Sequence, residues 1–303
     1  MNYHGPTEND GIQPDRKISD PVAKLCDALL SHPRFEAAAF YYFDNVMQWR
    51  REIGYFNNFI SSYTRNTIIA YVCFLHFANE TGLPDGGATF GRIWSVVERR
   101  GDCGSRALRT ILGLISFAGY FSKQQGVVDK RSFAYVPTPK MLTHYSHHLA
   151  NTIRCFDILL DVDVYAKRAA TEPGYVSKMM RSSGAAAVKY DITFAEFDKH
   201  LLHIANMCGG FATLYAAARA DMRAEPMPQQ TEIARLYKVS PSQARAVITY
   251  ATRHGLMSFD ESGNLLSAAN GTRLIKMLLA RELALYAKFT LGLEEKLQEH
   301  VKA

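Results

Sequence analysis

The clearest indication of the fold lies in residues 231–256, which read TEIARLYKVSPSQARAVITYATRHGL. Val239 is placed to fill a turn between two helices, and Ser240 can cap the second of them. Pro241 would be its first residue, where a missing N–H is harmless, and Gly255 would end it. A short first helix, capped by Thr231, would have three apolar residues on its buried side: Ile233, Ala234 and Leu236. The spacing predicts a helix-turn-helix.

A small β-hairpin is expected directly after this motif. Residues 256–259 and 265–267 are mostly apolar, and the polar turn at residues 260–264 separates them. A hairpin in this place is the wing of a winged helix-turn-helix.

The same layout occurs a second time, 136 residues earlier. Residues 104–119, GSRALRTILGLISFAG, align without a gap with residues 240–255, SPSQARAVITYATRHG. At about 100° per residue, each segment divides into an apolar and an exposed side. The apolar sides are Leu108, Ile111, Leu112 and Ile115 in the earlier copy, and Ala244, Val247, Ile248 and Ala251 in the later one. Residues 90–98 would be the first helix of the earlier copy, with a wing at residues 120–122 and 132–136.

Helical segments flank both copies in the same order. Apolar helix precedes them at residues 35–79 and 194–220, and long helix follows at residues 139–167 and from residue 272 onward. We therefore expect a disordered lead over residues 1–18, a first repeat over 19–170, a connector over 171–190 and a second repeat over 191–303. The Ser-Ser-Gly at residues 182–184 predicts a break within the connector.

This order resembles one subunit of a MarR-like winged helix-turn-helix transcription regulator of bacteria, written twice in one chain. The resemblance implies a mainly α fold of tandem winged helix-turn-helix domains with small hairpin wings. The long flanking helices would pack into an intrachain pseudo-dimer. It also implies double-stranded DNA as the partner, with the two recognition helices in successive major grooves.

Exposed polar side chains on both recognition helices are the candidate DNA contacts. Arg106 and Arg109 lie one helical turn apart and suit bidentate contacts with guanine, while Thr110 can touch a thymine methyl. Ser105 and three cations of the first wing loop, Lys123, Lys130 and Arg131, join them. The second copy contributes Ser240, Ser242, Arg245, Thr249 and Arg253.

Charge differs between the copies. Residues 85–140 contain nine Lys or Arg against four Asp or Glu, whereas residues 225–273 contain five against four. Affinity for DNA rises with the number of phosphates neutralised, so the first copy is expected to bind more strongly. The second wing, FDESGN, has two acidic residues at its tip. Because the two recognition helices also differ, the sequence predicts an asymmetric DNA site with half-sites about one helical turn apart.

Composition limits the other possibilities. The 303 residues are 48% apolar and 21% charged, with a net charge of +6, which suits one large or two smaller packed domains. Five scattered cysteines without a CxxC pair predict a reduced, cytoplasmic protein. No secretory leader or membrane span is expected, since the longest apolar run covers only residues 67–78.

Catalysis and metal binding are disfavoured, and neither a cofactor nor a metal is expected. No phosphate loop, nucleophile elbow or HExxH motif occurs. His144, His147 and His148 have helical spacing for two metal ligands, but a solvated face explains them equally well. Asp157, Asp161 and Asp163 are interpreted as an acidic helical face rather than a two-metal site.

Three functional classes remain. Sequence-specific transcription regulation is preferred. A plasmid-type replication initiator, which also has two winged helices in one chain, is the second, and a tandem winged-helix module that binds protein is the third. The aromatic residues between positions 35 and 59 are interpreted mainly as core, although a pocket there for a small aromatic effector remains possible.

Overall fold

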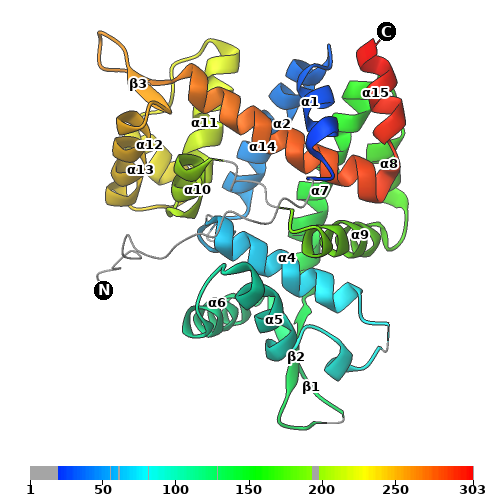
Figure 1. Ribbon diagram of the computed structural model, residues 1–303. Coiled ribbons are helices and arrows are strands. Elements are labelled where there is room, and N and C mark those ends of the chain that lie inside the picture. The colour runs from blue at the N-terminus through cyan, green and yellow to red at the C-terminus, as the bar shows by residue number, and fades with distance from the viewer. Residues whose placement is uncertain are drawn as a thin grey trace.

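The computed structural model describes residues 20–54, 56–60, 62–80, 82–127, 129–192 and 198–302. The expected disordered lead over residues 1–18 lies outside these ranges. The described chain is mainly helical, with two small antiparallel two-stranded sheets, as the sequence predicts (Figure 1).

In the first half of the chain, the helices α1 to α6 precede the first hairpin. Its elements are α1 (Ala23–Leu30), α2 (Phe35–Glu52), α3 (Phe56–Ile60), α4 (Tyr63–Phe77), the 3-10 turn η1 (Pro84–Gly86), α5 (Phe90–Arg100), α6 (Ser105–Phe117), β1 (Phe121–Gln125), β2 (Phe133–Pro137) and α7 (Pro139–Leu160). In the hairpin, Phe121 pairs with Pro137 and Gln125 with Phe133.

The second half repeats this order. Its elements are α8 (Tyr165–Thr171), α9 (Tyr175–Lys189), α10 (Lys199–Asn206), α11 (Gly210–Arg223), α12 (Gln230–Tyr237), α13 (Pro241–Arg253), β3 (Met257–Phe259), β4 (Leu265–Ser267) and α14 (Ala269–Tyr286). A π-helical turn, η2 (Ala287–Leu291), and α15 (Glu294–Lys302) follow it.

Corresponding elements of the two halves also make corresponding contacts. α4 packs against β2 as α11 packs against β4, and α6 lies beside β1 as α13 lies beside β3. Between the halves, α4 packs on α9 while α11 packs on α2, and α7 contacts α8 while α14 contacts α1. The buried apolar side chains form one continuous cluster through both halves. The halves are therefore interlocked around a shared core.

Residues 171–190, the expected connector, belong to this helical body. They contain the end of α8 and the whole of α9, and the predicted break at residues 182–184 is wrong because the helix runs through it. The close approach of α4 accounts for the glycine at position 184, because a Cβ built there would lie 2.6 Å from Cβ of Phe74. Glycine in α9 therefore lets α4 approach closely.

We expect Gly184→Ala to lower the free energy of unfolding by about 1–3 kcal/mol, since a Cβ there would force α4 and α9 apart. Thermal or denaturant unfolding measures this change. Gly91→Ala is the matched control, because that helical glycine has open space around its Cβ position. The control should leave stability unchanged or raise it by up to about 1 kcal/mol. Equal stabilities of the two variants would contradict the close approach.

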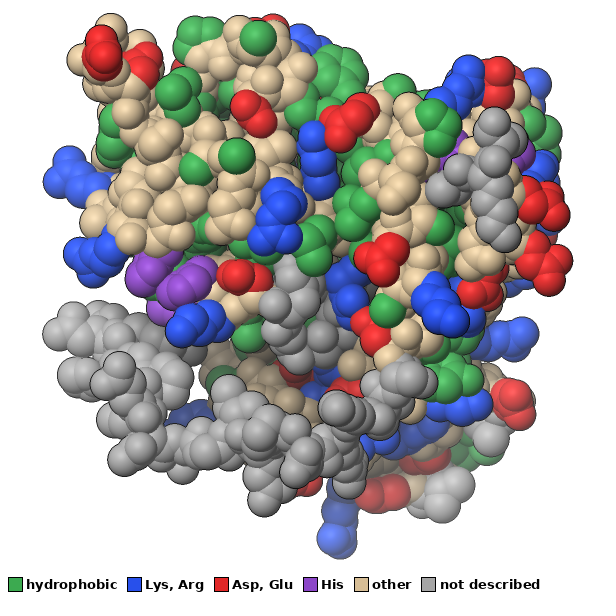
Figure 2. Space-filling model, turned by 45° about the horizontal axis from the view of Figure 1, so that its top comes forward, with side chains coloured by type: hydrophobic (Ala, Val, Ile, Leu, Met, Phe, Trp, Pro, Cys, Tyr) green, Lys and Arg blue, Asp and Glu red, His purple; other side chains and the backbone are tan. Residues whose placement is uncertain are grey.

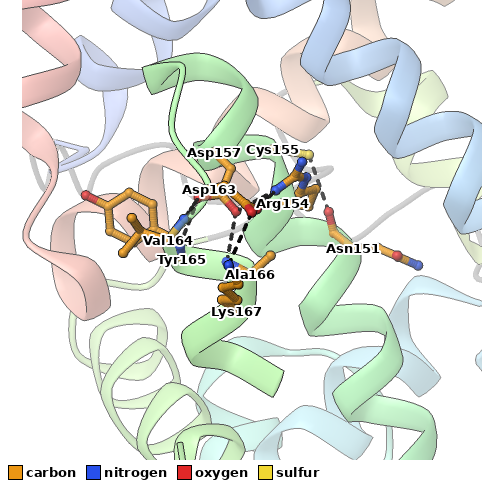
Figure 3. A network of polar contacts seen from close by, with 9 residues as sticks. All are labelled: Asn151, Arg154, Cys155, Asp157, Asp163, Val164, Tyr165, Ala166 and Lys167. Carbon is orange, nitrogen blue, oxygen red and sulfur yellow. Dashed lines mark hydrogen bonds and ion pairs between the residues drawn. The ribbon is translucent and has the colours of Figure 1, made fainter. Parts of the chain in front are cut away.

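A buried carboxylate joins α7 to α8 (Figure 3). Asp157 Oδ1 accepts hydrogen bonds from the backbone N–H groups of Val164 at 3.0 Å and Tyr165 at 2.8 Å. Asp157 Oδ2 accepts from the N–H of Ala166 at 2.9 Å and lies 3.3 Å from Nη1 of Arg154. These bonds satisfy donors at the start of α8 that the helix leaves free.

The interpretation of this region as an acidic helical face is therefore wrong. Asp157 points inward, and its side chain is wholly buried. Asp161 ends α7 in the left-handed conformation and pairs with Arg34 at 2.6 Å, while Asp163 pairs with Arg154. Each carboxylate has a structural partner.

Candidate nucleic-acid interface

α6 presents the predicted basic residues to solvent. Leu108, Leu112 and Ile115 are fully buried, and Ile111 is half-buried, so the inward face of the helix is as predicted. The exposed face contains Arg106, Arg109 and Thr110, and Ser105 at the first helical position is half-buried. The exposure of the first three is confirmed; their contact with DNA stays a prediction.

The two arginines of α6 are held differently. The guanidinium carbon of Arg109 lies 4.0 Å from the centre of the Phe90 ring, a cation–π contact that orients the side chain. Thr110 Oγ1 donates to the carbonyl of Arg106 at 3.1 Å, whereas the Arg106 guanidinium has no partner among the described residues. The guanidinium of Arg109 is thus held in place by Phe90, while the guanidinium of Arg106 is free to change its orientation.

The first wing differs from its prediction in one respect. β1 extends to Gln125, so Lys123 lies within the strand rather than the loop, with its ammonium 4.3 Å from the centre of the Phe133 ring. The cation–π contact with Phe133 therefore orients the Lys123 side chain on the exposed strand. Lys130 and Arg131 are exposed in the loop, as expected.

Asp85 fastens this wing loop to the body of the protein. Its Oδ2 accepts from the N–H of Val127 at 2.8 Å, and its Oδ1 accepts from the hydroxyl of Ser132 at 3.0 Å. A Cβ at Gly126 would lie 2.3 Å from Asp85 Oδ1, so glycine is required there. The wing cations are consequently presented on an anchored loop.

Part of the basic charge of the first copy faces other protein groups. Arg92 donates to the carbonyl of Gly87 at 3.2 Å, Arg99 donates to the carbonyl of Val188 at 3.0 Å, and Arg100 pairs with Asp191. These three arginines bind within the protein. The excess of nine basic over four acidic residues therefore overstates the charge available to DNA.

α13 is bounded largely as the sequence predicts. Ser240 caps it in a capping box with Gln243, Pro241 is its first residue, and Val239 is buried in the turn before it. The predicted cap by Thr231 is wrong: the N-cap of α12 is Gln229, two residues earlier, and no side chain caps the helix. The predicted inward residues are all buried: Ala244, Val247, Ile248 and Ala251.

The exposed face of α13 carries the predicted polar residues. Ser242, Arg245, Thr249 and Arg253 are exposed, and no side-chain partner of Arg245 or Arg253 occurs among the described residues. Ser240 is also exposed, but its hydroxyl accepts from the N–H of Gln243 at 3.2 Å and lies 2.9 Å from the Ser242 hydroxyl. The Ser240 hydroxyl is therefore engaged mainly in capping the start of α13.

We expect Ser240→Ala to lower the free energy of unfolding by about 1 kcal/mol, the usual effect of losing an N-cap side chain. Chemical denaturation measures it. Ser242→Ala removes a neighbouring hydroxyl that caps no backbone group, so its effect should stay below about 0.5 kcal/mol. A Ser240→Ala protein as stable as the wild type would contradict the capping role.

The second wing is acidic at its tip. Asp260 Oδ1 accepts from the N–H groups of Ser262 at 2.9 Å and Asn264 at 2.7 Å, which closes the turn. The hydrogen bond from the Asn264 side chain is the main cause that holds the pKa of Asp260 below its usual range. Figure 2 shows acidic side chains at the upper left, at the end of this hairpin. The wing therefore disfavours close approach to phosphate.

Two features near α6 and α13 were not predicted from the sequence. On α6, Leu114 is 50% exposed and Phe117 is 91% exposed, although both are large apolar residues. Phe117 follows Arg106 by eleven residues, which places both on one side of the helix. This spacing in the sequence could have predicted that Phe117 lies on the exposed side of α6.

Histidines gather beside the start of α10 and the end of α13, on the left of Figure 2. The rings of His200 and His254 stack at 4.2 Å, and His203 stacks on Tyr250 at 4.2 Å. Desolvation, together with nearby His200 and Arg253, lowers the pKa of His254. These rings stack face to face, so their nitrogen atoms do not point toward one common position.

The three histidines considered as metal ligands lie elsewhere, on α7. His144 packs beside Phe56 and His148 stacks on Trp49 at 5.0 Å, so neither belongs to a fully solvated face, and that alternative is wrong for both. His147 is exposed. Among the residues that the structure describes, no three His, Cys, Asp or Glu side chains form a possible metal site.

Comparison of the chain with protein-family models, with curated proteins and with solved structures finds no match. Within the described ranges, no single helix is long and apolar enough to cross a membrane. The bent pair α10 and α11, at 116° to each other, reaches the required length and composition only when the two are taken together.

Proposed function

We propose that the protein is a sequence-specific double-stranded DNA-binding transcription regulator. α4–β2 and α11–β4 would be two winged helix-turn-helix units, held as a pseudo-dimer within one chain by the remaining helices. The observation that carries the proposal is the repeated order and contacts of nine elements around two exposed, arginine-bearing helices, α6 and α13. Each helix would enter a major groove.

The arrangement of the two units suits one DNA duplex. In Figure 1 α13 and α6 both lie on the left, while the β3–β4 hairpin points up and the β1–β2 hairpin points down. Two such helices held in one chain could enter successive major grooves of a single duplex, about one helical turn apart. Because α6 offers Arg106 and Arg109 where α13 offers Ser242 and Arg245, the two half-sites should differ.

A protein-binding module is the second candidate. The exposed Leu114 and Phe117 on α6 favour it, because large apolar side chains on a surface often mark a protein partner. A replication initiator would share the DNA-binding surfaces of the first candidate and differ in binding repeated origin sites.

Selection from a random pool of double-stranded DNA tests the proposal. We expect enrichment of a motif with two unequal half-sites, and an affinity that falls with rising salt as phosphate contacts are screened. Tandem copies of one motif in bound genomic fragments would indicate an initiator. Failure to enrich any sequence, with only weak binding at low salt, would contradict DNA reading and leave the protein-binding module.

A further inference from the structure

A cavity of about 150 Å³ lies where the two halves of the chain meet. Seven helices line it, α2, α3, α4 and α7 from the first half and α9, α11 and α14 from the second. Its walls are largely aromatic: Tyr42, Trp49, Phe56, Tyr145, Phe211 and Tyr215. A cavity of similar size in another protein accepts benzene, so there is room here for one small ring or a branched chain.

A buried cation forms one part of the wall. Arg50 is only 6% exposed, and its Nη1 donates to Oδ1 of Asn57 at 2.8 Å. Its guanidinium carbon lies 5.6 Å from the centre of the Tyr215 ring, and its Nε has no hydrogen-bond partner. Burial is the main cause that lowers the pKa of Arg50. No carboxylate of the described chain forms an ion pair with this guanidinium.

A carboxylate forms another part of the wall. Glu282 of α14 accepts a hydrogen bond from the hydroxyl of Tyr42 at 3.1 Å and lies 3.5 Å from Nε2 of His148. Burial and the adjacent Glu282 raise the pKa of Tyr42 well above its usual value, which keeps its hydroxyl protonated as the donor. Arg50 and Glu282 thus face one cavity without an ion pair between them.

We propose that this cavity binds a small zwitterion, an α-amino acid with an apolar side chain. Its carboxylate would lie against Arg50, its ammonium against Glu282, and its side chain among the aromatic walls. A buried arginine without an ion-pair partner costs much free energy, and the carboxylate of the zwitterion would supply that partner. The ammonium would add a charge-assisted contact to Glu282, beside those from Tyr42 and His148. A simple aromatic acid would neutralise only the arginine. The site is independent of the proposed DNA contacts, because α6 and α13 do not line it.

Calorimetric titration of the full chain tests the proposal with L-phenylalanine and L-valine. We expect at least one of them to bind with a dissociation constant of about 1 mM or tighter. The matched analogues that each lack one charge, 3-phenylpropionate and 2-phenylethylamine for L-phenylalanine, and 3-methylbutanoate and 2-methylpropylamine for L-valine, should bind at least about tenfold more weakly than the parent amino acid, because each loses a charge-assisted contact.

Two variants test the two charged groups of the cavity separately. Glu282→Gln keeps an acceptor for Tyr42 and is expected to weaken amino-acid binding about tenfold or more without changing the binding of the matched carboxylic acid. Arg50→Lys should weaken both, and a circular-dichroism melt checks that each variant is folded; should Arg50→Lys fail to fold, Glu282→Gln alone decides. Binding of the carboxylic acid as tight as that of its amino acid, equal binding to wild type and folded Glu282→Gln, or no binding of either amino acid, would overturn the proposal.

Discussion

Replacing Arg106 and Arg109 together by alanine is expected to lower affinity for the selected DNA about 100-fold. Each bidentate arginine–guanine contact contributes about 1–3 kcal/mol to discrimination between bases, so two lost contacts amount to about 3 kcal/mol or more. Both side chains are exposed on one face of α6, and Phe90 orients Arg109. A titration of labelled DNA measures the effect.

The pattern of the loss is as informative as its size. Sequence preference should collapse while weak, salt-sensitive binding persists, because the wing cations Lys130 and Arg131 remain. Replacing Lys178 and Arg181 together by alanine removes an equal charge from the exposed side of α9 and serves as the control. Unchanged enrichment by the double variant, or an equal loss in the control, would show that α6 does not read base edges.

Asp157→Ala should lower the free energy of unfolding by about 3 kcal/mol. Three backbone N–H groups at the start of α8 lose their acceptor, and buried donors left without a partner are destabilising. The side chain of Asp157 is wholly buried, so water cannot readily replace it. Denaturant unfolding measures the difference.

Asp163→Ala is the matched control for that substitution. Asp163 also pairs with Arg154, but its side chain is 64% exposed, and surface pairs of this kind contribute at most about 1 kcal/mol. The Asp163→Ala protein should therefore unfold close to the wild type. If both substitutions had the same small effect, the network around Asp157 would not hold α7 and α8 together.

The local structure could be predicted because it depends on residues close in sequence. The apolar periodicity of α6 and α13 indicated which side chains are buried, and the Ser240-Pro241 start of α13 follows from the chemistry of helix caps. Both hairpins were likewise expected. Within the two helix-turn-helix segments and their hairpins, the extent of β1 and the cap of α12 differed from the prediction.

Long-range contacts are what the sequence did not show. Gly184 predicts a break when α9 is considered alone, but the helix is continuous and the glycine makes room for Phe74 of α4. Arg99 and Arg100 were counted as charge available to DNA, although they contact the region around the end of α9. The Arg50 and Glu282 side chains are 232 positions apart in sequence, so their shared cavity has no local signal.

If one chain carries two helices that each enter a groove, the stoichiometry and the footprint of its complex with the selected DNA should show it. We predict one chain per site, protecting two unequal half-sites about one helical turn apart, with Arg245→Ala weakening protection at only one of them. Two chains bound to a perfect palindrome, or a single protected half-site unaffected by Arg245→Ala, would contradict it.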